Sequence, residues 1–217
     1  LPISLSSGNA TTLSNTGEIL MIGSNQSTYG IIISASKVAV VIKSGVTLTY
    51  TGTTGAIIMA AGSSGTHITY PWIEGPGTST DTGTHLSMSA STATGVGMSY
   101  VDFGVVRGLR SVGGGTGFRF VDTNALTLTD LVANETSSAG GSDYGCGFYF
   151  AATSSTSANS YVSATRLTAN QNGRCGIRNA SYLNNFEFTT LRTASNTGTG
   201  IMISGPTGAR SEEHTSE

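Results

Sequence analysis

The chain has 217 residues, enough for one domain with a sizeable core. Only 10% of them are charged, and the formal net charge is −2 at pH 7. The basic residues form no cluster, so we expect no nucleic-acid partner. No run of 18 apolar residues occurs either, so we expect no membrane-spanning helix and no membrane partner.

The two ends differ in composition from the rest of the chain. Residues 1–17 are polar and are predicted to be a lead-in segment, followed by one domain over 18–209. The last eight residues, 210–217, resemble the in-frame translation of a sequencing-library adapter, and such an artefact tail says nothing about the fold. With no start Met at Leu1 and this tail at the other end, we expect a fragment truncated at both ends.

The first predicted strands are nearly continuous apolar runs. A strand is expected at Glu18–Ile22, and two more at Tyr29–Ile33 and Val38–Ile42. Runs without polar alternation are typical of strands that are buried on both faces. From Ser44–Leu48 onward the pattern becomes a regular repeat.

A six-residue motif recurs in this repeat, with apolar residues at its first, third and sixth positions. The first and third side chains point to one face of a strand, because side chains alternate with a period of two. The sixth breaks that alternation, so we expect the chain to bend just before it. Copies of the motif begin at Ile68, Met98, Leu126, Val162 and Phe186.

A second motif alternates with the first: a glycine followed by an apolar residue, a variable residue and another apolar residue. Two different strands per turn, each recurring in its own column, fit a chain that winds round a cylinder. We therefore predict an all-β fold, a right-handed parallel β-helix of about six to seven rungs. Phe118 should stack on Phe148, and Phe120 on Phe150. The glycines of the second motif are Gly55, Gly117, Gly147, Gly176 and Gly200.

An asparagine follows the first motif at Asn134, Asn170 and Asn196, and we expect these amides to form a ladder between rungs. The two alternating motifs and this asparagine resemble the pectin-lyase-like superfamily, over roughly 18–204. That superfamily includes polysaccharide lyases, polygalacturonase-type hydrolases and phage tail-spike depolymerases. The Asp motif of the polygalacturonase type is not found before the glycines of the second motif, and the lyase-type Arg and carboxylate motifs are not recognised either.

The resemblance implies an extracellular or virion-surface protein whose partner is a polysaccharide. Two functions stay open: a depolymerase that cleaves the polysaccharide as a hydrolase or lyase, and a non-enzymatic adhesin or structural fibre. A tail-spike-like protein would be a homotrimer. We predict no cofactor and no metal, because His67 and His85 have no ligand partner at metal-binding spacing.

Surplus residues in the longer rungs should form loops, and loops on one edge of a solenoid often wall a binding groove. Such loops are predicted at 104–116, 135–145 and 151–160.

The fifth position of the first motif supplies the candidate catalytic residues, Asp102 and Asp130. On adjacent rungs they would lie about 5 Å apart. Two carboxylates at such range can share a proton and act as the acid and the nucleophile or base of glycoside hydrolysis. Trp72, at the same position, would be a platform for a sugar ring. The alternative is that these polar residues bond to the backbone of the bend.

The variable position of the second motif supplies the candidate carbohydrate-binding residues Arg119, Tyr149 and Arg178. Guanidinium groups would hold the carboxylates of an acidic polysaccharide, and the tyrosine ring would stack on a sugar. The alternative is a cation–π ladder that merely covers the sheet. Cys146 and Cys175 precede the glycines of successive strands, and we predict a stacked pair of reduced, buried thiols, with a disulfide as the less favoured outcome.

Overall fold

A computed structural model describes residues 5, 8–141, 144–153, 159–180 and 183–203. Nearly all regular structure in these residues is β-strand, and the exception is one turn of 3-10 helix, η1 (Ser138–Gly140). No helix in this part of the chain is long and apolar enough to cross a membrane. The adapter-like tail at 210–217 lies outside the described residues.

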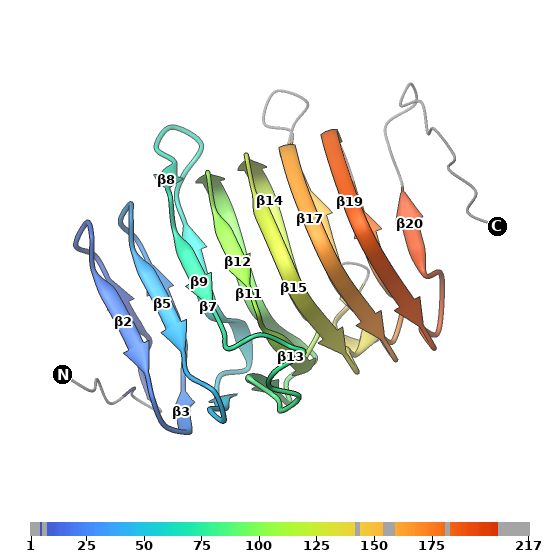
Figure 1. Ribbon diagram of the computed structural model, residues 1–217, viewed down its shortest axis with the longest axis horizontal. Coiled ribbons are helices and arrows are strands. Elements are labelled where there is room, and N and C mark those ends of the chain that lie inside the picture. The colour runs from blue at the N-terminus through green and yellow to red at the C-terminus, as the bar shows by residue number, and fades with distance from the viewer. Residues whose placement is uncertain (1–4, 6–7, 142–143, 154–158, 181–182, 204–217) are drawn as a thin grey trace.

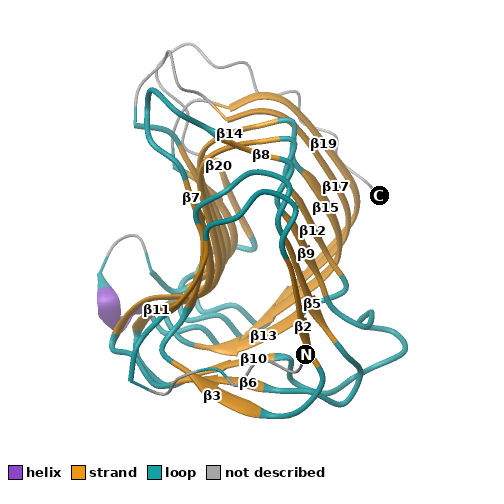
Figure 2. Ribbon diagram, turned by 90° about the vertical axis from the view of Figure 1, so that its left-hand side faces the viewer, coloured by secondary structure: helices purple, strands orange, loops and turns teal. Residues whose placement is uncertain are grey.

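The strands form three faces of a prism, with parallel pairing throughout (Figures 1 and 2). The first face contains β1 (Thr11–Leu13), β4 (Ile31–Ile33), β7 (Thr54–Ala61), β11 (Thr92–Asp102), β14 (Thr116–Asn124), β16 (Cys146–Ala151), β18 (Cys175–Asn179) and β20 (Ile201–Ile203). The second face contains β2 (Ile19–Ile22), β5 (Ala39–Ile42), β9 (Trp72–Glu74), β12 (Val105–Arg107), β15 (Thr127–Asn134), β17 (Asn159–Asn170) and β19 (Leu183–Ala194). The third face contains β3 (Gln26–Thr28), β6 (Leu48–Tyr50), β10 (Leu86–Met88) and β13 (Arg110–Gly113), and then the far ends of β15, β17 and β19. The short strand β8 (Ile68–Thr69) pairs with the end of β11 at the corner between the first two faces.

Each rung visits the three faces in order, so the fold is a parallel β-helix, as predicted. The rungs begin at β1, β4, β7, β11, β14, β16 and β18. Strand β20 pairs with β18 and begins the next turn of the chain. The described residues thus form seven rungs, within the predicted six to seven. The first rung begins at Thr11–Leu13, which lies inside the segment expected to be a lead-in, 1–17. This strand pairs with Ile31–Ile33 on the next rung.

Single residues with left-handed backbone turn the rungs at their corners. The corner between the second and third faces is Gly108, Asp130, Arg166 and Thr190 on successive rungs, with φ between 55° and 67°. This confirms the predicted bend before the sixth position of the first motif, because the left-handed residue is the fifth. The corner between the first and second faces has φ between 53° and 82° at Gly17, Lys37, Tyr70, Phe103, Ala125, Tyr161 and Asn185.

The core consists of side-chain columns that run along the axis. The Phe118 and Phe148 rings stack with centroids 5.0 Å apart, and Phe120 and Phe150 stack at 5.3 Å. All four side chains are fully buried, as predicted. Because each ring has a partner on the next rung, a missing ring would leave a cavity that the column cannot close.

The glycines of the second motif lie where the first face approaches the third. A Cβ on Gly117 would lie 2.6 Å from the Ala133 Cβ and 2.7 Å from the Gly147 carbonyl oxygen, so no larger residue fits. Gly95 occupies this position in β11, whereas Gly55, which we assigned to it, is two residues out of register. That assignment was wrong because rungs of unequal length hide the true alignment.

Two copies of the first motif were also misaligned. Ile73 pairs with Val106 and so with Leu128, the third position of the motif rather than the sixth. Met98 pairs with Phe120 on the first face. Phe103 was therefore expected inside but is exposed on a corner.

An asparagine ladder exists and includes Asn196, but the other two predicted members, Asn134 and Asn170, are not in it. The Asn172 side chain donates to the Asn196 Oδ1 at 2.9 Å and accepts from the Thr136 hydroxyl at 3.0 Å. Asn134 and Asn170 pair with each other two residues earlier, at the level of Ala194. The residue that stacks on Asn196 is Asn172, because the turn places it two residues beyond the end of β17.

Cys146 and Cys175 form a disulfide between adjacent rungs, with Cα atoms 4.6 Å apart. Our prediction of reduced thiols was wrong. It treated the two side chains as strictly parallel, but side-chain torsions and strand twist let the sulfur atoms turn toward each other. Both residues are buried.

Candidate functional site

The outward column of the first face holds the predicted carbohydrate-binding residues. Arg119 pairs with Tyr149, and Tyr149 with Arg178, so the three lie on adjacent rungs as expected. Gly97 and then Met59 precede Arg119 in the same column. Along the axis, the outward column therefore reads Met59, Gly97, Arg119, Tyr149 and Arg178.

Tyr149 lies between the two arginines, and each guanidinium carbon is 5.4 Å from its ring centroid. Only 4% of Tyr149 is exposed, so its ring faces are covered and cannot stack on a sugar. That part of the prediction was wrong. The ring instead holds the two half-buried arginines at a fixed spacing along the face.

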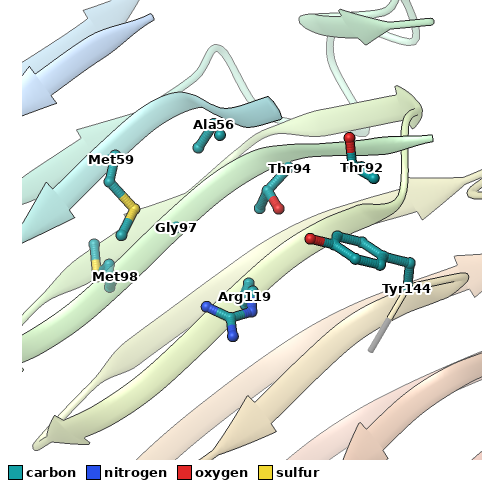
Figure 3. A pocket seen from close by; sticks show the side chains of 9 residues that line it. Ala56, Met59, Thr92, Thr94, Gly97, Met98, Arg119 and Tyr144 are labelled. Carbon is teal, nitrogen blue, oxygen red and sulfur yellow. The ribbon is translucent and has the colours of Figure 1, made fainter. Parts of the chain in front are cut away.

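A pocket of about 280 Å³ lies beside Arg119, over Gly97 (Figure 3). It exists because Gly97 brings no side chain to an outward position between Met59 and Arg119. A Cβ on Gly97 would lie 2.5 Å from the Met59 sulfur. Figure 3 shows Arg119 and Tyr144 on one side of Gly97 and Met59 on the other. The lining residues are Gly55, Ala56, Met59, Thr92, Thr94, Gly97, Met98, Arg119 and Tyr144.

Tyr144 is the wall of this pocket and comes from the predicted loop 135–145. Its ring packs on two glycines: a Cβ on Gly115 would lie 2.5 Å from the ring and one on Gly140 2.7 Å. The disulfide begins two residues later at Cys146 and anchors this end of the loop. No acidic side chain forms an ion pair with Arg119 in the described part of the chain, so its charge is available to an anion in the pocket.

The other two predicted loops do not wall this pocket. Residues 104–116 form β12 and β13 rather than a loop, because they are the second and third faces of an ordinary rung. Much of 151–160 lies outside the described residues.

Trp72 lies on the second face, away from the Arg119 column, where it pairs with Ala39 and Val105. Its indole N–H donates to the Glu74 carboxylate at 2.8 Å, and the Arg107 guanidinium lies 4.5 Å from its ring. Partial burial raises the pKa of Glu74, but hydrogen bonds from Arg107 and Trp72 outweigh it and hold the pKa below its ordinary value. Trp72 is thus engaged with its own neighbours rather than placed beside the two aspartates.

The candidate catalytic residues Asp102 and Asp130 are not neighbours, and that prediction was wrong. Asp102 pairs with Asn124, which is separated from Asp130 by the corner at Ala125. The two carboxylates therefore lie on different faces and have different partners. Asp102 contacts His67 at 3.0 Å, and Asp130 accepts from Thr78.

Sequence patterns missed the buried His85. Its Nδ1 accepts from the Arg110 backbone N–H at 3.0 Å, and its Nε2 lies 3.7 Å from Asp81. Burial lowers the pKa of His85, although the Asp81 charge opposes this. Hydrogen bonds from Gly45, Gly83 and Ser44 lower the pKa of Asp81 to about 2. Both residues follow β9 in a segment that carried no repeat pattern, so only the structure could pair them.

The chain matches no family model, and comparisons with curated proteins and with solved structures find no match either. No group of three or more His, Cys, Asp and Glu in the described ranges could hold a metal ion. The functional argument therefore depends on the geometry of the first face.

Proposed function

We propose that this parallel β-helix binds an acidic polysaccharide on its first face, with Arg119 holding a sugar carboxylate or sulfate over Gly97. The observation that carries the proposal is the pocket in which a bare glycine position, a thioether, a tyrosine ring and an arginine meet. The resemblance to the pectin-lyase-like superfamily points the same way.

The residues around the pocket supply what a sugar needs. Arg119 offers a planar set of N–H donors that suits a carboxylate. Met59 and Tyr144 offer apolar surface to the C–H face of the ring, and the Thr92 hydroxyl, which donates to the Thr53 carbonyl at 2.6 Å, can accept a hydrogen bond from the sugar. Arg178, held beyond Tyr149, would meet a second acidic group about 10 Å along the chain, since rungs repeat about every 4.8 Å.

The first face is proposed to bind the polysaccharide without hydrolysing it. Glycoside hydrolysis needs two carboxylates about 5 to 10 Å apart across the bond. Asp102 and Asp130 lie on different faces, and the residues lining the pocket include no carboxylate. An adhesin or a binding module of a larger protein therefore fits better than a glycoside hydrolase. The disulfide supports an extracellular or virion-surface location, where such bonds persist.

Affinity electrophoresis in gels cast with acidic or neutral polysaccharides tests the proposal. We expect acidic gels to retard the wild type, and Arg119→Ala to weaken binding about 10- to 100-fold, the loss of one charged hydrogen-bonding group. Salt should weaken binding further. Arg166→Ala is the matched control, because Arg166 is exposed on a different face. Equal retardation of the wild type and Arg119→Ala in acidic gels would remove this site.

A further inference from the structure

Aromatic side chains are exposed along the corner between the first and second faces. Tyr70, Phe103 and Tyr161 occupy this corner and are 52%, 45% and 64% exposed. The register places Ala125 between Phe103 and Tyr161, so the order on successive rungs is Tyr70, Phe103, Ala125 and Tyr161. In Figure 2 this corner lies at the top, near the labels of β8 and β14.

The backbone gives no reason for aromatic residues here. The corner requires a left-handed residue, with φ of 57° at Tyr70 and Phe103 and 54° at Tyr161. That conformation is unfavourable for bulky side chains, and glycine occupies the same position at Gly17. Exposed rings also gain little from burial. Every rung turns here on a left-handed residue, so the corner accounts for that conformation but not for the choice of three large, exposed rings.

Tyr70 and Phe103 already form a platform. Their rings stack with centroids 4.9 Å apart and planes 12° apart. One face of Phe103 thus contacts Tyr70, and the other faces the next rung. There Ala125 brings only a methyl group, so that ring face is not covered by a corner side chain.

Hydrogen-bonding groups flank the platform. His67 Nδ1 lies 3.0 Å from the Asp102 carboxylate, which directly precedes Phe103. Both side chains are partly exposed, at 32% and 24%. The contact with Asp102 fixes the imidazole, so that its Nε2 can bond a hydroxyl group. Flat apolar ring faces next to fixed polar groups match a pyranose, which has a C–H face and a rim of hydroxyls.

We propose that the corner of Tyr70, Phe103 and Ala125, flanked by His67 and Asp102, is a second binding site that takes an uncharged sugar ring stacked on Phe103 over Ala125. The inference rests on the proposed glycan binding, and it adds a neutral sugar to the acidic one on the first face. A glycan chain would run along the axis at this corner, toward Tyr161.

Affinity electrophoresis in gels cast with neutral polysaccharides, a β-glucan and a galactomannan, tests this site. We expect at least one gel to retard the wild type, and Phe103→Ala to weaken binding about 2- to 10-fold, as for the loss of one aromatic contact. Ala125→Phe should weaken binding similarly, since it fills the place of the sugar. Ala125→Gly is the matched control, because it keeps the left-handed backbone and adds no ring. Thermal unfolding should show that all variants remain folded.

The two sites give separable results. Binding at the corner should persist at high salt and in Arg119→Ala, whereas binding on the first face should not. Neutral-gel retardation that is unchanged in both Phe103→Ala and Ala125→Phe overturns the corner site and leaves the first face standing. Loss in the corner variants alone, with Arg119→Ala unaffected in acidic gels, supports the corner and overturns the first face. No retardation of the wild type in any gel contradicts both.

Discussion

Thr78 donates hydrogen bonds from its backbone N–H and its hydroxyl to the Asp130 carboxylate, at 2.8 Å and 2.5 Å. The two residues are 52 positions apart in the chain. Asp130 is itself a left-handed corner residue and is largely buried. Its carboxylate thus ties the segment after β9 to the bend in β15, which is a structural role.

Replacing Asp130 by alanine should therefore lower the free energy of unfolding without affecting glycan binding. Two hydrogen bonds to a charged acceptor would be lost, and we expect a decrease of about 2 to 4 kcal/mol in urea unfolding. Asp102→Ala is the control, because the Asp102 carboxylate contacts the partly exposed His67, and the substitution should cost less than about 1 kcal/mol. Equal losses for the two variants would contradict the assigned role of Asp130.

The asparagine ladder gives a second matched pair. Asn172 is fully buried and bonds to Thr136 and Asn196 on both neighbouring rungs, so Asn172→Ala should cost about 2 to 4 kcal/mol. Asn134 has a buried Oδ1 without a hydrogen-bond partner in the described part of the chain. Asn134→Ala should cost less than about 1 kcal/mol in the same unfolding measurement. The reverse order would restore the ladder predicted from the sequence.

Much of the fold could be predicted because side-chain periodicity reports directly on inward and outward positions. The Phe118 and Phe148 stack and the Arg119, Tyr149 and Arg178 column follow from one alignment of similar strands. Alignment failed where rungs differ in length: Asp102 was aligned with Asp130, although it pairs with Asn124. The pocket could not be predicted, because it depends on the absence of a side chain at Gly97 and on Tyr144 folding back from a loop.

Acid should destabilise the protein in two steps. The pKa of His85 is lowered by burial, so the unfolded state binds its proton first, and stability should fall as the pH drops below about 6.5, the value for a free histidine. The pKa of Asp81 is about 2 when folded, against 3.8 when free. Its contribution is present above pH 3.8 and is lost as the pH falls toward 2. Urea unfolding from pH 8 to pH 2 measures both steps, and Asp81→Asn should remove the second.

The disulfide should be detectable directly. Thiol titration of the denatured, unreduced protein is expected to find no free thiol from Cys146 and Cys175. The bond closes a loop of 29 residues, so its reduction should lower the free energy of unfolding by about 3 to 4 kcal/mol. Two titratable thiols in freshly purified protein would instead support the reduced pair.

The central claim is that the pocket over Gly97 holds an acidic sugar, and Gly97→Leu tests it most directly. A Cβ at Gly97 would lie 2.5 Å from the Met59 sulfur, and this flexible side chain can shift, so the fold should survive while the pocket is filled. The measurement is the dissociation constant for an acidic oligosaccharide, determined by calorimetry for the wild type and the variant at equal ionic strength. We predict that Gly97→Leu loses measurable binding and keeps the melting temperature of the wild type within a few degrees. Unchanged affinity in a folded Gly97→Leu protein would contradict the claim.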